Sequence, residues 1–253
     1  MGPTGFTRGA PAKFFIYKTM KIGIAGIGGI EPVKTNIIDS RLDVLEKMFK
    51  SAKKTYLQVE IITGQDKLKE ADGIIAAETA KLDLVLSDLE FVELRLARGA
   101  EATEKNVLDR FKEHLEKEGL LSQLEVNEEE KKIVSAYSLL TVKPVYFAPQ
   151  QSAGDKNKLL FDAYYGLGYI CFFTAGEKEA RAWPIKKGTS AWEASGCIHS
   201  AIQRGFIRAE VVGYEDLISA GGISVARGVG KARLEGKEYI VQDGEYMEIR
   251  CSK

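Results

Sequence analysis

Apolar residues in the first third of the chain come in short runs between glycine-rich and polar stretches. The run from Lys21 to Gly26 ends in glycine and is typical of a buried first strand in an α/β sheet. The stretch from Ile27 to Lys34 is predicted to be a glycine-rich loop. Ser40 is then predicted to cap a helix over Arg41–Phe49. Alternating and β-branched residues over Thr55–Thr63 predict a second strand.

The hydrophobic period changes to that of a helix after Glu70. Apolar residues at spacings of three and four predict a long amphipathic helix, ended by Gly99, whose apolar positions are Leu82, Val85, Leu86, Leu89, Val92 and Leu96. A second helix, with Val107, Phe111 and Leu115 spaced by four, ends near Gly119. A third begins after Asn127, and its apolar face is predicted to be Ile133, Tyr137 and Leu140. The three predict a helical hairpin or coiled-coil insert, after which Val142–Ala148 returns to strand.

From Gly168 to Lys253 the pattern is that of a compact β-rich module. Strands are predicted at Tyr169–Thr174, Glu179–Ile185 and Phe206–Val212, and helices at Ser190–Gln203 and Asp216–Ala220. Lys237–Val241 and Glu245–Arg250 are predicted to form a closing hairpin around the Asp243-Gly244 turn. This order matches a β-grasp, or ubiquitin-like, sheet. Small sheets of this kind usually present an open face or edge to a partner.

Composition excludes several classes of protein. The 253 residues are 45% hydrophobic and 28% charged, which is ordinary for a globular protein. The 36 acidic residues balance the 36 basic ones, so no strongly basic nucleic-acid clamp is indicated overall. The three cysteines form no CxxC or Cys/His cluster, which leaves no readable zinc site or disulfide framework and fits a reducing cytoplasm. No apolar run approaches the ~20 residues that span a bilayer, so no membrane location is expected.

The first 19 residues are interpreted as an extension upstream of the natural start, because Met20 opens a clean strand. A targeting signal is the alternative. The first 30 residues carry Arg8, Lys13, Lys18 and Lys21 and no acid. However, the apolar stretch Phe14–Tyr17 is too short for a secretory signal.

The glycine-rich loop after the first strand is the most obvious candidate site. A phosphate-binding loop, G-x-x-x-x-G-K-[ST], holds phosphate with backbone N–H groups and its lysine, while its hydroxyl reaches magnesium. Counted from Gly26, the second glycine position holds Glu31, the lysine position Pro32 and the hydroxyl position Val33. A dinucleotide motif fails as well, because its third glycine is missing. We therefore predict a plain loop. The alternative is a rearranged ATP or GTP site with magnesium, made of Gly26, Gly28, Gly29, Lys34 and Thr35.

Two histidines and two tryptophans are further candidates for functional chemistry. Cys197 and His199 are two positions apart on a predicted helix and point away from each other, so a packed cysteine and a capping or surface histidine are predicted rather than a nucleophile–base pair. His114 lies between glutamates and is predicted to be solvated. Trp183 and Trp192 are candidate stacking platforms for bases, although burial of at least one is favoured.

Basic residues surround the C-terminal module and are the predicted partner-binding set: Lys178, Arg181, Lys186, Lys187, Arg204 and Arg208. Acidic residues interleave with them, namely Glu177, Glu179, Glu193 and Glu210. An RNA-facing patch is one interpretation of this arrangement, and a solvated mixed surface is the other.

Several C-terminal segments carry a resemblance to a known family: Phe172–Trp183, Lys187–Thr189, Gly196–His199, Arg204–Val211 and Val241–Gly244. Together they closely resemble the C-terminal TGS-type domain of the YchF / Obg-like ATPase family, over essentially all of 168–253. A weaker resemblance extends upstream to Met20–Gly26, Arg41–Asp43 with Lys53–Thr55, Leu86–Leu96 and Leu139–Val145.

The chain departs from this family at the positions that bind nucleotide. The phosphate-binding loop is absent, as counted above. Ile62–Gln65 stands where the family has a magnesium-side D-x-A-G stretch, and Ala148–Gln151 stands where it reads the base with an Asn-x-x-Glu type motif. The chain is also markedly shorter than a full family member. No catalytic residue of the family therefore has a matching position here.

The expected fold is α/β, with a remnant P-loop-GTPase-like parallel sheet, a helical coiled-coil insert and a C-terminal β-grasp (TGS) domain. We expect the chain to divide into four parts: an N-terminal extension (1–19), a degenerate G-domain core (20–80 and 141–167), a helical arm (81–140) and a TGS-like domain (168–253). The resemblance implies ribosome or RNA partners for a cytoplasmic, non-catalytic binding protein without a cofactor. Residual ATP or GTP binding is the alternative, and a decayed fragment a third possibility. Exposed sheet edges predict a homodimer.

Overall fold

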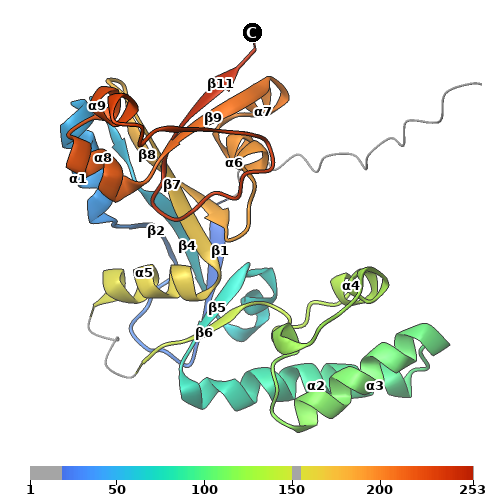
Figure 1. Ribbon diagram of the computed structural model, residues 1–253. Coiled ribbons are helices and arrows are strands. Elements are labelled where there is room, and N and C mark those ends of the chain that lie inside the picture. Colours follow the sequence, from blue (N-terminus) through green and yellow to red (C-terminus); the bar gives the residue numbers. More distant parts are fainter. Residues whose placement is uncertain (1–18, 150–154, 253) are drawn as a thin grey trace, which may run out of the picture.

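The computed structural model describes residues 19–149 and 155–252, and these ranges contain two β-sheets (Figure 1). Residues 1–18 of the predicted extension and Gln150–Gln151 of the predicted base-recognition stretch lie outside the described residues. In the part of the chain that is described, no helix is long and apolar enough to cross a membrane.

The first sheet has five strands in the order β2-β4-β1-β5-β6. They are β1 (Met20–Ala25), β2 (Val33–Ile37), β4 (Leu57–Thr63), β5 (Gly73–Ala76) and β6 (Val145–Phe147). The strand β1 lies between β4 and β5 and is parallel to both, while β2 pairs antiparallel with β4 at the edge. Because the apolar run of β1 is buried on both faces, it forms the centre of this sheet. The predicted α/β class is confirmed.

Three local predictions near this sheet are wrong in detail. Val33 and Lys34 belong to β2, so the glycine-rich loop is shorter than predicted. The cap of helix α1 (Ser40–Phe49) is Asp39, whose carboxylate accepts the Arg41 N–H at 3.0 Å, and not Ser40. The predicted strand Thr55–Thr63 is divided, because β3 (Lys54–Thr55) pairs with the second sheet while β4 pairs with the first.

The division at Tyr56 has a side-chain cause. The Tyr56 hydroxyl donates to the Asp43 carboxylate, which also accepts from Lys54 Nζ at 2.6 Å. The Thr55 hydroxyl donates at 2.5 Å to Glu179, which directly precedes Ala180 of the second sheet. These contacts hold the chain against α1 and β8 (Ala180–Lys186) for two residues before it joins the first sheet.

The helical arm consists of α2 (Lys81–Ala97), α3 (Ala102–Glu116) and α4 (Glu128–Ser135), which Figure 1 shows at the opposite end of the molecule from α8 and α9. The predicted helices α2 and α3 are confirmed, and one apolar cluster joins them through residues such as Val92, Val107 and Phe111. Short 3-10 turns, η1 (Gln65–Glu70), η2 (Glu78–Ala80) and η3 (Leu121–Gln123), complete this half of the chain.

Two predictions in the arm are wrong. The third helix ends at Ser135, so Tyr137 and Leu140 lie beyond it. The cause is Asp88, which is buried on α2 and accepts the backbone N–H groups of Leu140 and Thr141 at 2.8 and 2.7 Å. His114 is half-buried rather than solvated, since its Nε2 lies 3.0 Å from the Leu120 carbonyl.

The second sheet has the order β10-β9-β11-β7-β8-β3. Its further strands are β7 (Tyr169–Ala175), β9 (Phe206–Val212), β10 (Arg233–Glu235) and β11 (Tyr246–Cys251). The β7–β8 hairpin is antiparallel, and β11 lies parallel to β7 and antiparallel to β9. Its helices are α6 (Ala191–Ile198), α7 (Ser200–Arg204), α8 (Tyr214–Ala220) and α9 (Ile223–Gly228), and α5 (Lys156–Gly166) precedes it. The predicted strands of β7, β8 and β9 are confirmed.

Two predictions for this sheet are wrong. The helix Ser190–Gln203 is broken at His199, whose extended backbone ends α6 and whose Nδ1 accepts the Ala201 N–H at the start of α7. The hairpin around Asp243 does not form, because β11 pairs with β9 and β7 instead. The segment before it is held by side chains: the Glu245 carboxylate accepts the Gln242 N–H and the Tyr239 hydroxyl.

A single apolar cluster runs through both sheets. It includes Ile22 and Ile61 of the first sheet, Leu45 of α1, and Phe173 and Tyr246 of the second sheet, all at most 4% exposed. The helices α1 and α5 therefore pack between the sheets rather than belonging to one of them. The predicted boundary between residues 167 and 168 stays a prediction, although a shared core makes independent folding of the two sides unfavourable.

Candidate functional site

A pocket of about 230 Å³ lies at the carboxyl ends of β1, β5 and β6. Ligands of open α/β sheets bind outside the carboxyl ends of the strands, where the strand order reverses, and β1 is the strand at which it reverses here. The pocket is lined by Gly26, Ile27, Gly28, Ala77, Glu78, Thr79, Ala148, Pro149 and Leu159. It is therefore the candidate ligand site of the first sheet.

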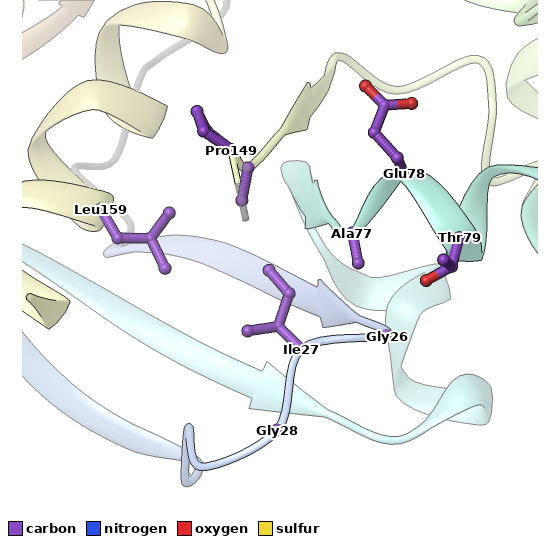
Figure 2. A pocket seen from close by; sticks show the side chains of 9 residues that line it. Gly26, Ile27, Gly28, Ala77, Glu78, Thr79, Pro149 and Leu159 are labelled. Atoms are coloured by element: carbon purple, nitrogen blue, oxygen red, sulfur yellow. The ribbon is translucent and has the colours of Figure 1, made fainter. Parts of the chain in front are cut away.

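The lining of this pocket is mostly apolar. Figure 2 shows the side chains of Ile27, Pro149 and Leu159 around one space, with Glu78 and Thr79 beside Ala77. Glu78 and Thr79 supply the polar side chains, and the described lining contains no lysine or arginine. A carboxylate next to an apolar surface repels a phosphate group and gives it no cation to bind.

The need for glycine at position 26 of this loop is explained by packing as well as by backbone conformation. Gly26 has a φ of +69°, and a Cβ there would lie 2.7 Å from the Cβ of Ala80. A Cβ at Gly28 or Gly29 would meet nothing within 4 Å, although Gly29 has a φ of +76° and so favours glycine by its backbone conformation. Gly26 thus allows β1 to pass close to η2, and this requirement exists without a phosphate.

The other two residues of the predicted alternative site lie elsewhere. Lys34 and Thr35 are on β2, which is separated from β1 by β4, so their backbone is about 10 Å from β1 across the sheet. Lys34 is exposed and lies opposite Glu60. The structure thus brings Gly26 and Gly28 to the pocket but leaves Lys34, Thr35 and Gly29 out of its lining.

A nucleoside triphosphate with magnesium does not fit these residues. Such a ligand needs a row of backbone N–H groups, a lysine at the phosphates and a hydroxyl or carboxylate at the metal. The pocket offers Glu78 and Thr79 for a metal but no cation for phosphate. Within the described ranges, no cluster of three or more His, Cys, Asp or Glu side chains is arranged to hold a metal ion.

Cys197 and His199 do not form a catalytic pair. His199 uses its Nδ1 to cap α7, as a capping histidine was predicted to do. The Cys197 thiol contacts the Glu193 carbonyl at 3.9 Å, and burial raises the pKa of this thiol to about 11. A thiol in that state is mainly protonated near neutral pH and is a poor nucleophile.

The predicted partner-binding residues of the second sheet are exposed or half-buried, and two of them stack on aromatic rings. The Arg181 guanidinium lies 4.1 Å from the Trp183 ring centre, and Lys186 Nζ lies 5.9 Å from that of Tyr169. Trp183 itself is 7% exposed, so the predicted burial of at least one tryptophan is confirmed. Its ring supports Arg181 rather than offering a face to a base.

The structure divides these six basic residues between two ends of the sheet. Lys178 lies in the β7–β8 turn. Arg208 pairs with Arg250, and this part of β11 lies beyond the level of Phe173 of β7, toward the same turn. Arg181 and Arg204 lie toward the same end, whereas Lys186, opposite Tyr169, and Lys187 lie at the other. Among the described residues none of the six forms a salt bridge, although Arg227, Arg233 and Arg250 nearby do.

A charged network that the sequence did not predict joins α1 and α5 to the second sheet. Arg41 of α1 donates to Asp39 at 2.8 Å, to Asp243 at 2.7 Å and to the Tyr165 hydroxyl at 2.6 Å. Asp243 also accepts the Cys171 N–H at 3.0 Å. Burial raises the pKa values of the Tyr165 hydroxyl and the Cys171 thiol above their ordinary range.

This network explains why Asp243 is not a plain turn residue. Arg41 and Asp243 are 202 positions apart, so no local pattern connects them. The resemblance included Arg41–Asp43 and Val241–Gly244 as separate segments. Their joint occurrence in that resemblance was the one sequence signal that could have paired them. The network is structural, since its groups are held by one another.

Comparison with known proteins places these observations in a family. A family model described as "YchF-GTPase_C: Protein of unknown function (DUF933)" matches residues 169–252. The chain is 33% identical over 246 residues to the "Ribosome-binding ATPase YchF" of Bacillus subtilis, covering 72% of this chain and 67% of that protein. It is 30% identical over 251 residues to the protein of the same name from Escherichia coli O157:H7, covering 75% and 68%.

A solved structure shows the same fold. The structure described as "Structure of the Schizosaccharomyces pombe YchF GTPase" aligns with a TM-score of 0.73 and 18% sequence identity. The alignment covers 92% of this chain and 98% of that one, so it includes both sheets and the arm. This match confirms the predicted fold class.

Proposed function

The chain belongs to the YchF family, and from this premise we propose that it is a non-catalytic, ribosome-associated binding protein. Its contact surfaces are the second sheet, in the role of a TGS-like domain, and the helical arm. It acts without hydrolysing ATP or GTP and without a bound cofactor. The support for association with the ribosome is that its relatives carry the printed name "Ribosome-binding ATPase".

The observation that carries the non-catalytic part of this proposal is the lining of the pocket. The pocket occupies the ligand position of the first sheet, but its walls are apolar apart from Glu78 and Thr79. Stabilisation of a transferring phosphoryl group depends on positioned cations and N–H donors. A described lining without a lysine or arginine supplies no such cation.

The surfaces proposed for the ribosome are those with available charge and exposed apolar area. The six basic residues predicted as partner-binding make no salt bridge among the described residues, so their charge is available to an anionic partner. On the arm, Leu82, Leu86 and Leu94 of α2 are between 44% and 51% exposed. Figure 1 shows β9 and β11 of the second sheet at the opposite end of the molecule from α2 and α3.

Calorimetric titration of the full chain with ATP and with GTP, each with magnesium, tests the non-catalytic proposal. We expect no binding at micromolar concentrations and no release of phosphate. A Glu78→Gln variant serves as the matched control, because removing this carboxylate relieves repulsion of a phosphate in the pocket. Micromolar affinity in the wild type that changes in Glu78→Gln would overturn the proposal and assign nucleotide binding to this pocket.

Residual nucleotide binding is the second candidate function. It is favoured by one observation, the place of the pocket at the carboxyl ends of β1, β5 and β6. In that case the apolar walls hold a base and the phosphates extend into solvent. The same titration repeated with adenosine decides between the two functions, because adenosine would then bind about as well as ATP.

Co-sedimentation with purified ribosomes tests the partner. We expect the protein in the ribosome pellet at low salt and in the supernatant at high salt, because exposed charges are screened by salt. A protein that stays wholly in the supernatant at low salt would contradict ribosome association, whatever the titration shows.

A further inference from the structure

The strands β9 and β11 carry charged residues on the face that α9 partly covers. Cross-strand partners of an antiparallel pair lie on the same face, and residues two apart along a strand share it. On this face Glu210 is opposite Glu248, and Arg208 is opposite Arg250. The sheet thus presents an acidic pair followed directly by a basic pair.

The acidic pair is bridged by a cation. Arg227 of α9 donates to Glu210 at 2.7 Å and to Glu248 at 2.8 Å. The Glu210 side chain is 5% exposed, and the guanidinium of Arg227 lowers the pKa of this carboxyl. The repulsion between the two glutamates is therefore offset within the protein.

The basic pair has no equivalent bridge. Within the described residues no acidic side chain contacts both arginines. Arg208 makes no salt bridge there, and Arg250 has a longer contact, 3.4 Å, to the Glu210 already bound by Arg227. Like charges directly opposite each other on neighbouring strands are destabilising. Two exposed arginines thus lie opposite each other on the same face of the sheet.

The backbone beside Arg208 leaves room for its guanidinium. A Cβ added to Gly236 would lie 3.0 Å from Arg208 Nη1, so a larger residue there would displace this group. The Arg208 guanidinium thus lies next to the end of β10, where Gly236 leaves room for it. Nothing in this arrangement buries the charge.

We propose that Arg208 and Arg250 form a binding site for backbone phosphate of RNA, in which the phosphate bridges the two arginines as Arg227 bridges the two glutamates. Arginine suits this ligand because its planar N–H groups match phosphate oxygens two at a time. The inference rests on the proposed function, since ribosomal RNA is the phosphate-rich partner that ribosome association supplies. An acidic protein segment is the competing ligand, and the experiment separates it.

The test uses the full chain, a fluorescently labelled RNA hairpin and anisotropy titrations from about 50 to 200 mM KCl. The variants are Arg208→Gln, the Arg208→Gln/Arg250→Gln pair and Arg208→Glu. Lys67→Gln is the control, because Lys67 is an exposed cation in η1, outside the second sheet and the arm, without a salt bridge to a described residue. A polyglutamate peptide serves as the competing probe.

We expect RNA affinity to fall about tenfold for each lost phosphate contact near 0.1 M salt, and the slope of log K against log salt to fall by about 0.9 per contact. Lys67→Gln should bind as the wild type does. Arg208→Glu places an acid opposite Arg250, so its Tm should equal or exceed the wild-type Tm while RNA binding is lost. This combination separates a binding site from a structural role.

Unchanged RNA affinity in the double variant would overturn the site, and so would loss of polyglutamate binding with RNA binding intact. A lower Tm for Arg208→Glu would contradict the unbridged repulsion on which the site rests. Ribosome co-sedimentation distinguishes this failure from failure of the proposed function. If the double variant still pellets with ribosomes as the wild type does, ribosome association stands and the phosphate site does not.

Discussion

Removal of the Arg41 side chain should destabilise the molecule, because Arg41 links α1 to α5 and to the second sheet. Arg41→Met keeps the length of the side chain and removes its charge and donors. Asp39, whose side chain is 2% exposed, then loses its ion pair, and Asp243 and Tyr165 lose a donor. Uncoupling a buried ion pair costs about 3–5 kcal/mol.

The lower end of that range applies here for two reasons. Asp39 keeps the backbone N–H of residue 41 as a hydrogen-bond donor, and the Asp243 side chain is 31% exposed, so water partly solvates it. We therefore expect a loss of about 3 kcal/mol in the free energy of unfolding. In a chain of 253 residues this corresponds to a fall in Tm of about 6–12 °C.

Thermal unfolding followed by circular dichroism measures this effect, and a single transition is expected because one apolar cluster runs through both sheets. Arg98→Met, an exposed arginine, is the control and should change stability by no more than about 0.5 kcal/mol. A double-mutant cycle with Asp39→Asn isolates the pair, since asparagine still caps α1. A Tm loss below about 2 °C, or a coupling energy near zero, would refute this account of the network.

Other features give further expectations. Gly26→Ala should cost about 1–3 kcal/mol because its Cβ would meet Ala80, whereas Gly28→Ala should be near neutral; equal effects in chemical denaturation would contradict the packing explanation. Burial raises the pKa of Asp88 above its ordinary 3.8, so the folded state binds this proton more tightly than the unfolded state does. The contribution of Asp88 to the free energy of unfolding therefore falls as pH rises through the raised pKa. Asp88→Asn should remove this pH dependence in denaturation measured at several pH values. The edge strand β2, with Val33 42% exposed, should pair two copies of the chain, and sedimentation showing only monomer at high concentration would oppose this.

Local patterns determined the elements whose own residues decide their structure. The apolar runs at β1 and β7 and the spacing of three and four along α2 and α3 each specify an element by a local pattern alone. The missing phosphate-binding loop was also readable, because a motif is defined by residue type and spacing. The apolar lining of the pocket agrees with that reading.

Only the tertiary structure decided the elements that depend on distant partners. The run over residues 54–63 is continuous in sequence, yet Tyr56 and Glu179 draw its first part into the second sheet. The segment before β11 has the residues of a hairpin, but Asp243 is held by Arg41 and β11 pairs with β9 and β7. Hydrogen bonds between residues far apart in sequence outweigh a weak local strand preference, and no pattern along the chain records them.

The basic residues show the same division at the level of function. Their positions around the C-terminal module were readable from the sequence, but their grouping was not. The register of β9 and β11 sets Arg208 beside Arg250, and the fold places Lys186 at the other end of the sheet. The sequence by itself determined which charges the module carries, and strand pairing decided which of them share a surface.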